Sequence, residues 1–90
     1  MYQIKDRTGR MLEIGCPVVA QSKEGHISEG NVYDIFDYGC EWIDEKWTRG
    51  TVVILNHENG HREHWNPDNC DLLDGALMTS EQMQRHVAVD

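Results

Sequence analysis

Three histidines, His57, His61 and His64, lie close together in the run HENGHREHW. Neutral imidazole is a good zinc ligand, so their chemistry fits a metal site. Asn59-Gly60 between them is the strongest short-range signal for a β-hairpin with a two-residue type I′ turn. Because side chains alternate faces along a strand, His57 and His64 share one face as diagonal neighbours, and His61 points to the other. We therefore predict no metal cofactor. A site built on His57 and His64, completed by a ligand from elsewhere, is the alternative.

The cysteines are the next candidates, because nucleophilic catalysis needs a thiol or hydroxyl within hydrogen-bond reach of a base. No local signature pairs Cys16, Cys40 or Cys70 with a histidine. Cys16 and Cys70 are expected to be small core residues, and Cys40 is the expected exposed thiol. The glycines are scattered as turn formers and make no phosphate-binding loop. We therefore expect a protein that is not an enzyme and binds no cofactor.

The segment 38–47 combines large aromatic residues with carboxylates. Tryptophan and tyrosine dominate binding hot spots, and neighbouring carboxylates can meet lysine or arginine on a partner and steer its approach. The predicted partner-binding residues are Tyr38, Glu41, Trp42, Asp44, Glu45 and Trp47. The alternative is that one tryptophan caps the core while the other packs on the loop. Trp65 lies in a regular strand pattern and is expected in core or hairpin packing.

The charge balance bears on the class of partner. The 90 residues include 16 acidic and 8 basic ones, which gives a net charge of −8. Such a surface repels nucleic acid phosphates and favours a basic partner, unless the charge serves only solubility. The odd number of cysteines, without a CxxC pair, favours free thiols in a reducing cytoplasm. Neither a secretory signal nor a membrane-spanning segment is expected.

The elements that position these residues are short strands joined by tight turns. A turn is expected at residues 6–9, and Leu12 and Ile14 are expected on one face of the strand that follows. Pro17 should stand at the start or edge of the next strand, over residues 16–20. Further strands are predicted over residues 31–36, 51–57, 61–65 and 70–73. Residues 37–50 are predicted to form a loop, with a single helical turn around 42–46 as the alternative.

This pattern predicts an all-β domain, a small barrel of five to six short antiparallel strands, over residues 1–75. Residues 76–90 form a tail in which Ser80 is expected to cap a short helix that reaches residue 86. An unpaired barrel edge allows a homodimer as well as a monomer.

Residues 6–18 follow the pattern D-x-x-G-x-x-L-x-I-G-x-x-V, and a Gly-x-Val strand begins at Gly30. With a hairpin and a short closing strand at Leu72-Leu73, this resembles SH3-like barrel domains of small bacterial and bacteriophage proteins, and more loosely KOW and Tudor modules. The resemblance covers residues 6–73. It implies an SH3-like barrel whose acidic and aromatic loops form the binding surface. Nucleic-acid-binding KOW modules carry basic loops, whereas residues 24–45 hold seven acidic residues and no lysine or arginine.

Three functions follow from these observations. The first is a phage-type adaptor or inhibitor that engages a host protein through residues 38–47. The second is a nucleic-acid mimic, whose carboxylates imitate phosphates and occupy a DNA- or RNA-binding protein. The third is direct nucleic-acid binding, in which basic residues form a stripe and barrel aromatics stack on bases. The basic residues in question are Lys5, Arg7, Arg10, Lys46, Arg49 and Arg62.

Overall fold

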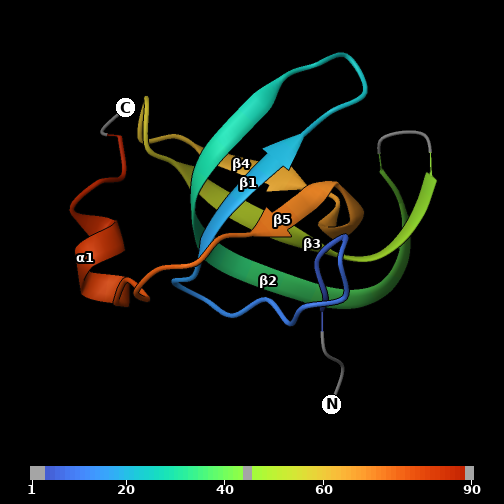
Figure 1. Cartoon of the computed structure of the whole chain (residues 1–90), viewed down its shortest axis with the longest axis horizontal. Coiled ribbons are helices and arrows are strands. Elements are labelled where there is room, and N and C mark those ends of the chain that lie inside the picture. The colour runs from blue at the N-terminus through green and yellow to red at the C-terminus, as the bar shows by residue number, and fades with distance from the viewer. Residues whose placement is uncertain (1–3, 44–45, 89–90) are drawn as a thin grey trace.

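The computed structural model describes residues 4–43 and 46–88, with the backbone alone for residues 38–43 and 46–49. Its centre is a five-stranded antiparallel sheet in the order β4-β3-β2-β1-β5 (Figure 1). The strands are β1 (Pro17–Gln21), β2 (Ile27–Ile43), β3 (Lys46–Asn56), β4 (Arg62–Trp65) and β5 (Cys70–Leu72). A 3-10 helix, η1 (Pro67–Asn69), joins β4 to β5, and the α-helix α1 (Ser80–Gln84) follows. The predicted all-β fold class with a short C-terminal helix is confirmed.

The sheet is curled but does not close into a complete barrel. β4 and β5 are its two edges, and among the described residues no ladder joins them. β2 bends strongly, so that β1 and β5 lie in front of β3 in Figure 1. Val18 of β1, Val32 of β2, Ile54 of β3, Trp65 of β4 and Cys70 of β5 belong to one buried cluster. A single apolar core inside the curl therefore holds all five strands together.

β3 is buried on both of its faces between residues 51 and 56. Val52 and Ile54 belong to the core cluster, whereas Val53 and Leu55, which alternate with them, are equally buried outside it. A half-covered antiparallel strand would alternate between buried and exposed residues, so this continuous burial requires cover on both faces.

The N-terminal segment is less regular than its sequence pattern. Its β-structure is an isolated bridge between Lys5 and Met11. The prediction that Leu12 and Ile14 share the face of a strand is wrong, because Leu12 is buried, Ile14 is exposed and the chain turns at residues 14–15. The backbone of Gly15 forms hydrogen bonds with β2. Its N–H donates to the Val32 carbonyl, and its carbonyl accepts from the buried Asn31 side chain.

The prediction of a loop over residues 37–50 is also wrong. β2 runs to Ile43 and β3 begins at Lys46, and Cα pairs continue from Cys40 with Arg49 to Ile43 with Lys46. Gly50, which suggested the end of a loop, lies at a β-bulge. The register shifts between Phe36 and Cys40, opposite Gly50, which has φ +84°. A bulge with glycine in the left-handed region bends a strand without ending it.

The connection between β3 and β4 is longer than the predicted two-residue turn. Leu55 pairs with Arg62, so residues 57–60 form the loop. The Gly60 N–H donates to the Asn56 carbonyl, and the Asn56 N–H donates to the His61 carbonyl. These hydrogen bonds close the hairpin at Asn56 and His61. A two-residue turn at Asn59-Gly60 would instead have closed it at Glu58 and His61.

The C-terminal segment packs back onto the sheet. Thr79, rather than the predicted Ser80, caps α1, and it forms a capping box with Gln82. Met83 on this helix is almost fully buried. The Ala88 N–H donates to the Gly60 carbonyl, so the chain beyond α1 returns to the β3–β4 loop.

We expect Met83→Ala to lower the free energy of unfolding by about 2–4 kcal/mol, because it leaves a cavity where a long apolar side chain was buried. Urea denaturation followed by circular dichroism measures the change. Leu77→Ala is the matched control, since Leu77 is 55% exposed, and it is expected to change little. Equal effects of the two substitutions would contradict the packing of α1 on the domain.

Candidate functional site

The segment predicted to bind a partner is the far part of the ribbon formed by β2 and β3, here called the arm (residues 38–47). Trp42 is paired in register with Trp47, and Glu41 with Thr48. The side chains of Tyr38, Cys40, Glu41, Trp42 and Trp47, and all of Asp44 and Glu45, lie outside the described residues. The structure thus gives this segment a paired backbone in place of an irregular loop.

The base of the arm is fixed by close backbone contacts at Gly50. A Cβ atom on Gly50 would lie 2.4 Å from the Phe36 carbonyl oxygen and 3.0 Å from the Ile4 Cδ1 atom. No other residue fits this position at its φ of +84° without moving the backbone. The point at which the arm leaves the body of the sheet is therefore set by packing.

Within the described residues, a second candidate is a hollow of about 410 Å³ beside Trp65, here called the Trp65 hollow. It lies between the turn joining β1 to β2, strand β4 and the 3-10 helix η1. Its lining residues are Ser22, His26, Glu63, His64, Trp65, Asn66 and Asn69. Residues far apart in the sequence thus meet at one edge of the sheet.

The side of this hollow formed by the turn is held in place locally. The Ser22 N–H donates to the His26 carbonyl at 2.9 Å, and the Ser22 Oγ accepts from the His26 N–H at 3.0 Å. The His26 imidazole lies parallel to the Trp65 indole, with 5.7 Å between ring centroids and 1° between planes. Its Nε2 atom is 3.8 Å from Glu63 Oε2. The imidazole therefore lies over the indole and next to the carboxylate.

The Glu63 carboxylate is partly buried and held by several donors. Burial alone would raise its pKa, but hydrogen bonds from the side chains of Ser28, Trp65 and Asn56, together with the nearby imidazole of His26, lower the pKa below its ordinary value. The Trp65 indole Nε1 donates to Glu63 Oε1 at 3.4 Å. Asn56 also donates to the Ser28 hydroxyl, which ties two of these donors together. Glu63 is thus a fixed, ionised acceptor at the edge of the hollow.

The outer face of β2 and β4 carries a second aromatic group. The Phe36 and His64 rings stack with 6.3 Å between centroids, and the Arg62 guanidinium lies 5.7 Å from the centroid of the Tyr33 ring. The Tyr33 hydroxyl accepts a hydrogen bond from Gln84 of α1. The hydrogen bond between Gln84 and Tyr33 joins the sheet to α1, and the Tyr33 ring makes a cation–π contact with Arg62.

The histidines do not lie as the predicted hairpin placed them. The His57 Nε2 atom contacts the Asn31 side-chain oxygen, whereas His64 stacks on Phe36. The expectation that His57 and His64 are diagonal neighbours is therefore wrong, because the loop at residues 57–60 takes His57 out of the β3–β4 ladder. No group of three or more histidine, cysteine or acidic side chains able to hold a metal occurs among the described residues.

Cys16 and Cys70 are buried and free, as their expected core role requires. Burial raises the pKa of the Cys70 thiol to about 12 and also raises the pKa of Cys16. Both are therefore protonated thiols at neutral pH and poor nucleophiles. Trp65 is buried in the core cluster, which confirms its predicted packing role.

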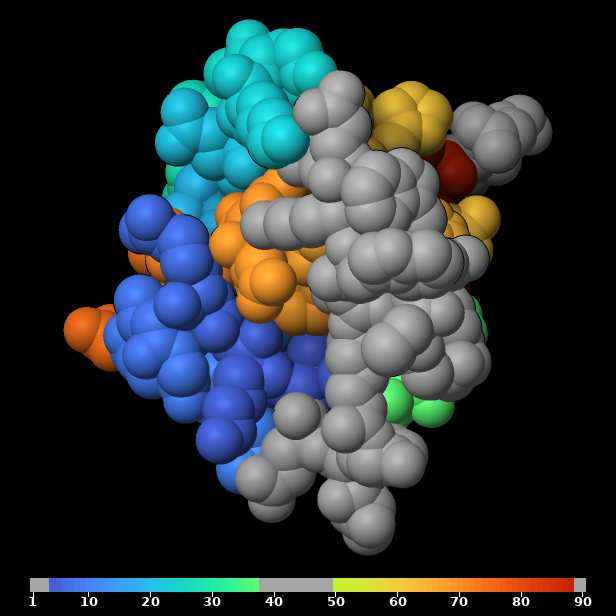
Figure 2. All heavy atoms as spheres, turned by 90° about the vertical axis from the view of Figure 1, so that its right-hand side faces the viewer, coloured from blue at the N-terminus to red at the C-terminus, as the bar shows by residue number. Residues whose placement is uncertain are grey.

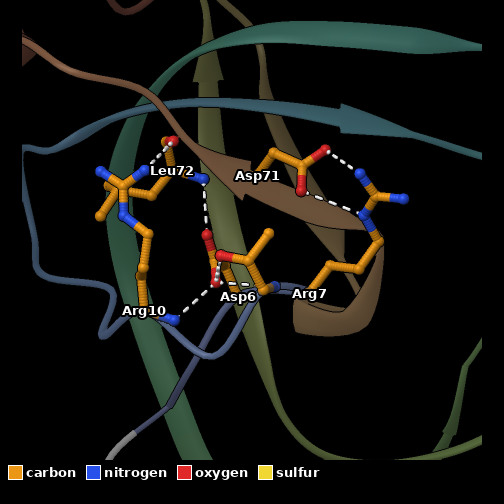
Figure 3. A network of polar contacts seen from close by, with 6 residues as sticks. Asp6, Arg7, Arg10, Asp71 and Leu72 are labelled. Atoms are coloured by element: carbon orange, nitrogen blue, oxygen red, sulfur yellow. Dashed lines mark hydrogen bonds and ion pairs between the residues drawn. The ribbon is translucent and has the colours of Figure 1, made fainter.

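The N-terminal turn is tied to β5 by a network of polar contacts (Figure 3). The buried Asp6 carboxylate accepts hydrogen bonds from the backbone of Thr8, Arg10 and Leu72 and from the Thr8 hydroxyl. Arg7 forms a two-point ion pair with Asp71. Figure 2 shows this turn (blue) lying against the η1–β5 segment (orange).

Two arginines proposed for a nucleic-acid stripe are thus already paired within the molecule. Arg7 contacts Asp71, and Arg10 contacts both Asp74 and the Leu72 carbonyl. Each ion pair is partly exposed, so it costs little to open, but each also places a carboxylate beside the arginine.

Sequence reasoning missed the partnership of His26 with Glu63 and Trp65. The alternation along β4 places Glu63 on the same face as Trp65, and this signal was available. The turn that carries His26 is too far away in the sequence for any local pattern to place it there.

In comparisons with protein-family models, with curated proteins and with solved structures, nothing matches this chain. The resemblance to SH3-like barrels therefore stays a prediction. No helix in the described part of the chain is long and apolar enough to cross a membrane.

Proposed function

We propose that this chain is a small acidic binding protein without catalytic activity, a phage-type adaptor or inhibitor that works in the cytoplasm. It engages a protein partner through the arm, with Trp42 and Trp47 as anchors and Glu41, Asp44 and Glu45 as the charges that attract a basic surface. The observation that supports this proposal is the backbone pairing of the arm, from Cys40 with Arg49 to Ile43 with Lys46. A paired ribbon presents its residues with less ordering cost than a loop would.

The distribution of charge also favours a protein partner over nucleic acid. The net charge of −8 opposes binding to phosphates. Of the arginines proposed for a nucleic-acid stripe, Arg7 and Arg10 are paired with carboxylates, and Arg62 lies over Tyr33. In direct nucleic-acid binding, the carboxylates of Asp71 and Asp74 would compete with phosphates for Arg7 and Arg10.

The test is affinity capture of the tagged protein from bacterial lysate, with and without nuclease, followed by mass spectrometry. A variant with Trp42→Ala, Glu41→Gln, Asp44→Asn and Glu45→Gln is expected to retain less than about a tenth of the captured partner, because it removes an aromatic anchor and its flanking charges. The matched control carries Glu13→Gln, Glu58→Gln and Asp74→Asn, which remove the same number of charges at exposed positions and should leave capture unchanged.

The outcomes separate the candidate functions. A nuclease-resistant protein that ordinarily binds DNA or RNA would favour mimicry of nucleic acid over an adaptor role. Capture that disappears with nuclease would favour direct nucleic-acid binding. Equal capture by the arm variant and the unmodified protein would exclude the arm as the binding site.

A further inference from the structure

The Trp65 hollow already contains an internal ligand, the imidazole of His26. This ring is planar, lies parallel to the Trp65 indole at 5.7 Å, and directs Nε2 toward Glu63 Oε2 at 3.8 Å. The position of His26 therefore shows which shape the hollow accommodates: a flat nitrogen-bearing ring that stacks on the indole and lies next to the carboxylate.

We propose that the Trp65 hollow is a binding site for the guanidinium group of an arginine on a basic partner, which takes the place of His26 over Trp65 and pairs with Glu63. Arginine fits this site better than lysine, because guanidinium is planar, stacks on aromatic faces and binds carboxylates through two parallel N–H donors. This inference rests on the proposed function only in assigning a basic partner, and its residues, Trp65 and Glu63, are not among those predicted to bind a partner in the arm.

Glu63 is suited to this role because it is held in place before any ligand arrives. Its side chain keeps 24% exposure, so one part of the carboxylate faces the hollow while Ser28, Asn56 and Trp65 hold the rest. Among the described side chains, the imidazole of His26 lies within ion-pair distance of Glu63, at 3.8 Å. An arginine would supply a permanent charge and two parallel donors at this place.

His26 is also easy to displace. Its side chain is 63% exposed, and it lies on a short turn between β1 and β2. Moving it away uncovers the indole face that it now covers. The hollow, at about 410 Å³, leaves room for a side chain to enter beside the turn.

The experiment uses the full chain, labelled with nitrogen-15, and Nα-acetylarginine amide as the probe. Saturable shifts of the Trp65 indole N–H and of the backbone amides around His26 are expected, with millimolar affinity. Nα-acetylcitrulline amide has nearly the same shape without the charge, and it should cause no saturable shift. This comparison needs no substitution, so it does not depend on the folding of any variant.

Two variants then assign the roles. Glu63→Gln is expected to weaken binding of the arginine probe about tenfold or more, since a charge-assisted pair is lost, whereas Glu58→Gln on the neighbouring loop should have no effect. His26→Ala removes the competitor, so this variant should bind the arginine probe more tightly.

Equal shifts from the arginine and citrulline probes, or shifts confined to residues 38–49 with the Trp65 indole unmoved, would overturn the proposal. Weaker binding by His26→Ala would also contradict it, because His26 would then be part of the site instead of its competitor. Failure of partner capture through the arm would leave these results unchanged, so the two proposals fail independently.

Discussion

Gly30→Ala is expected to abolish cooperative folding, because the added methyl group has no room between β2 and β3. A Cβ atom at this position would lie 1.8 Å from the Leu55 carbonyl oxygen and 2.8 Å from the Leu55 carbonyl carbon. Both atoms belong to the backbone of β3, and the Gly30–Asn56 pair lies in the centre of the sheet. The strands would have to separate, which we expect to cost more than about 4 kcal/mol.

Gly25→Ala is the matched control for this substitution. Gly25 has φ +89°, but a Cβ atom there has nothing within 4 Å. The same methyl group should therefore cost only the backbone strain of a left-handed residue, about 1–2 kcal/mol. Urea denaturation followed by circular dichroism separates the two. A Gly30→Ala protein with a transition close to that of the unmodified chain would show that β2 and β3 lie farther apart than described.

The parts of the fold that sequence predicts well are those encoded by local patterns. Residues 51–55 are an unbroken apolar and β-branched run, and they lie in β3. Pro17 begins β1, where its missing N–H removes no ladder bond. The prediction failed at Gly50, because a glycine occurs both at loop ends and at bulges. Gly50 suggested the end of a loop, but in the structure it lies opposite a bulge between two strands that continue.

The two candidate sites also differ in whether local sequence reveals them. Aromatic and acidic residues at 38–47 stand out in the sequence because they are neighbours in the chain. The Trp65 hollow does not stand out, because His26 and Glu63 meet only when β1 pairs with β2 and β4 pairs with β3. Contacts of this kind depend on the register of the strands. The register of β4 differs from the predicted one, because the β3–β4 loop is longer than a two-residue turn.

The second large effect on stability is expected from substitution of Asp6, whose carboxylate is buried. We expect Asp6→Asn to lower the free energy of unfolding by about 2–4 kcal/mol at pH 7. Oδ1 accepts from the Thr8 N–H, the Thr8 hydroxyl and the Arg10 N–H, and Oδ2 accepts from the Leu72 N–H. An asparagine of the same shape turns one of these acceptors into a donor, which then faces an N–H or O–H donor and cannot accept from it.

Asp71→Asn is the matched control on the same network. It also removes one carboxylate charge, but the Arg7–Asp71 ion pair is exposed to solvent, with side-chain exposures of 66% and 34%. Exposed ion pairs contribute little, so the denaturation midpoint should barely move. A large effect at Asp71 with a small one at Asp6 would reverse the roles assigned to the two carboxylates.

The pH dependence of Asp6→Asn gives a sharper test than its size. Burial alone would raise the pKa of Asp6, but the hydrogen bonds from Leu72, Thr8 and Arg10 outweigh it and lower the pKa below its ordinary value of 3.8. Asp6 therefore adds stability that is present above its unfolded-state pKa and is lost as the pH falls through the lower folded-state pKa. Protonated aspartic acid resembles asparagine in charge and donor pattern. The stability difference between the unmodified chain and Asp6→Asn should therefore shrink as the pH falls from about 7 to about 3, and a constant difference would show that the charge on Asp6 contributes nothing.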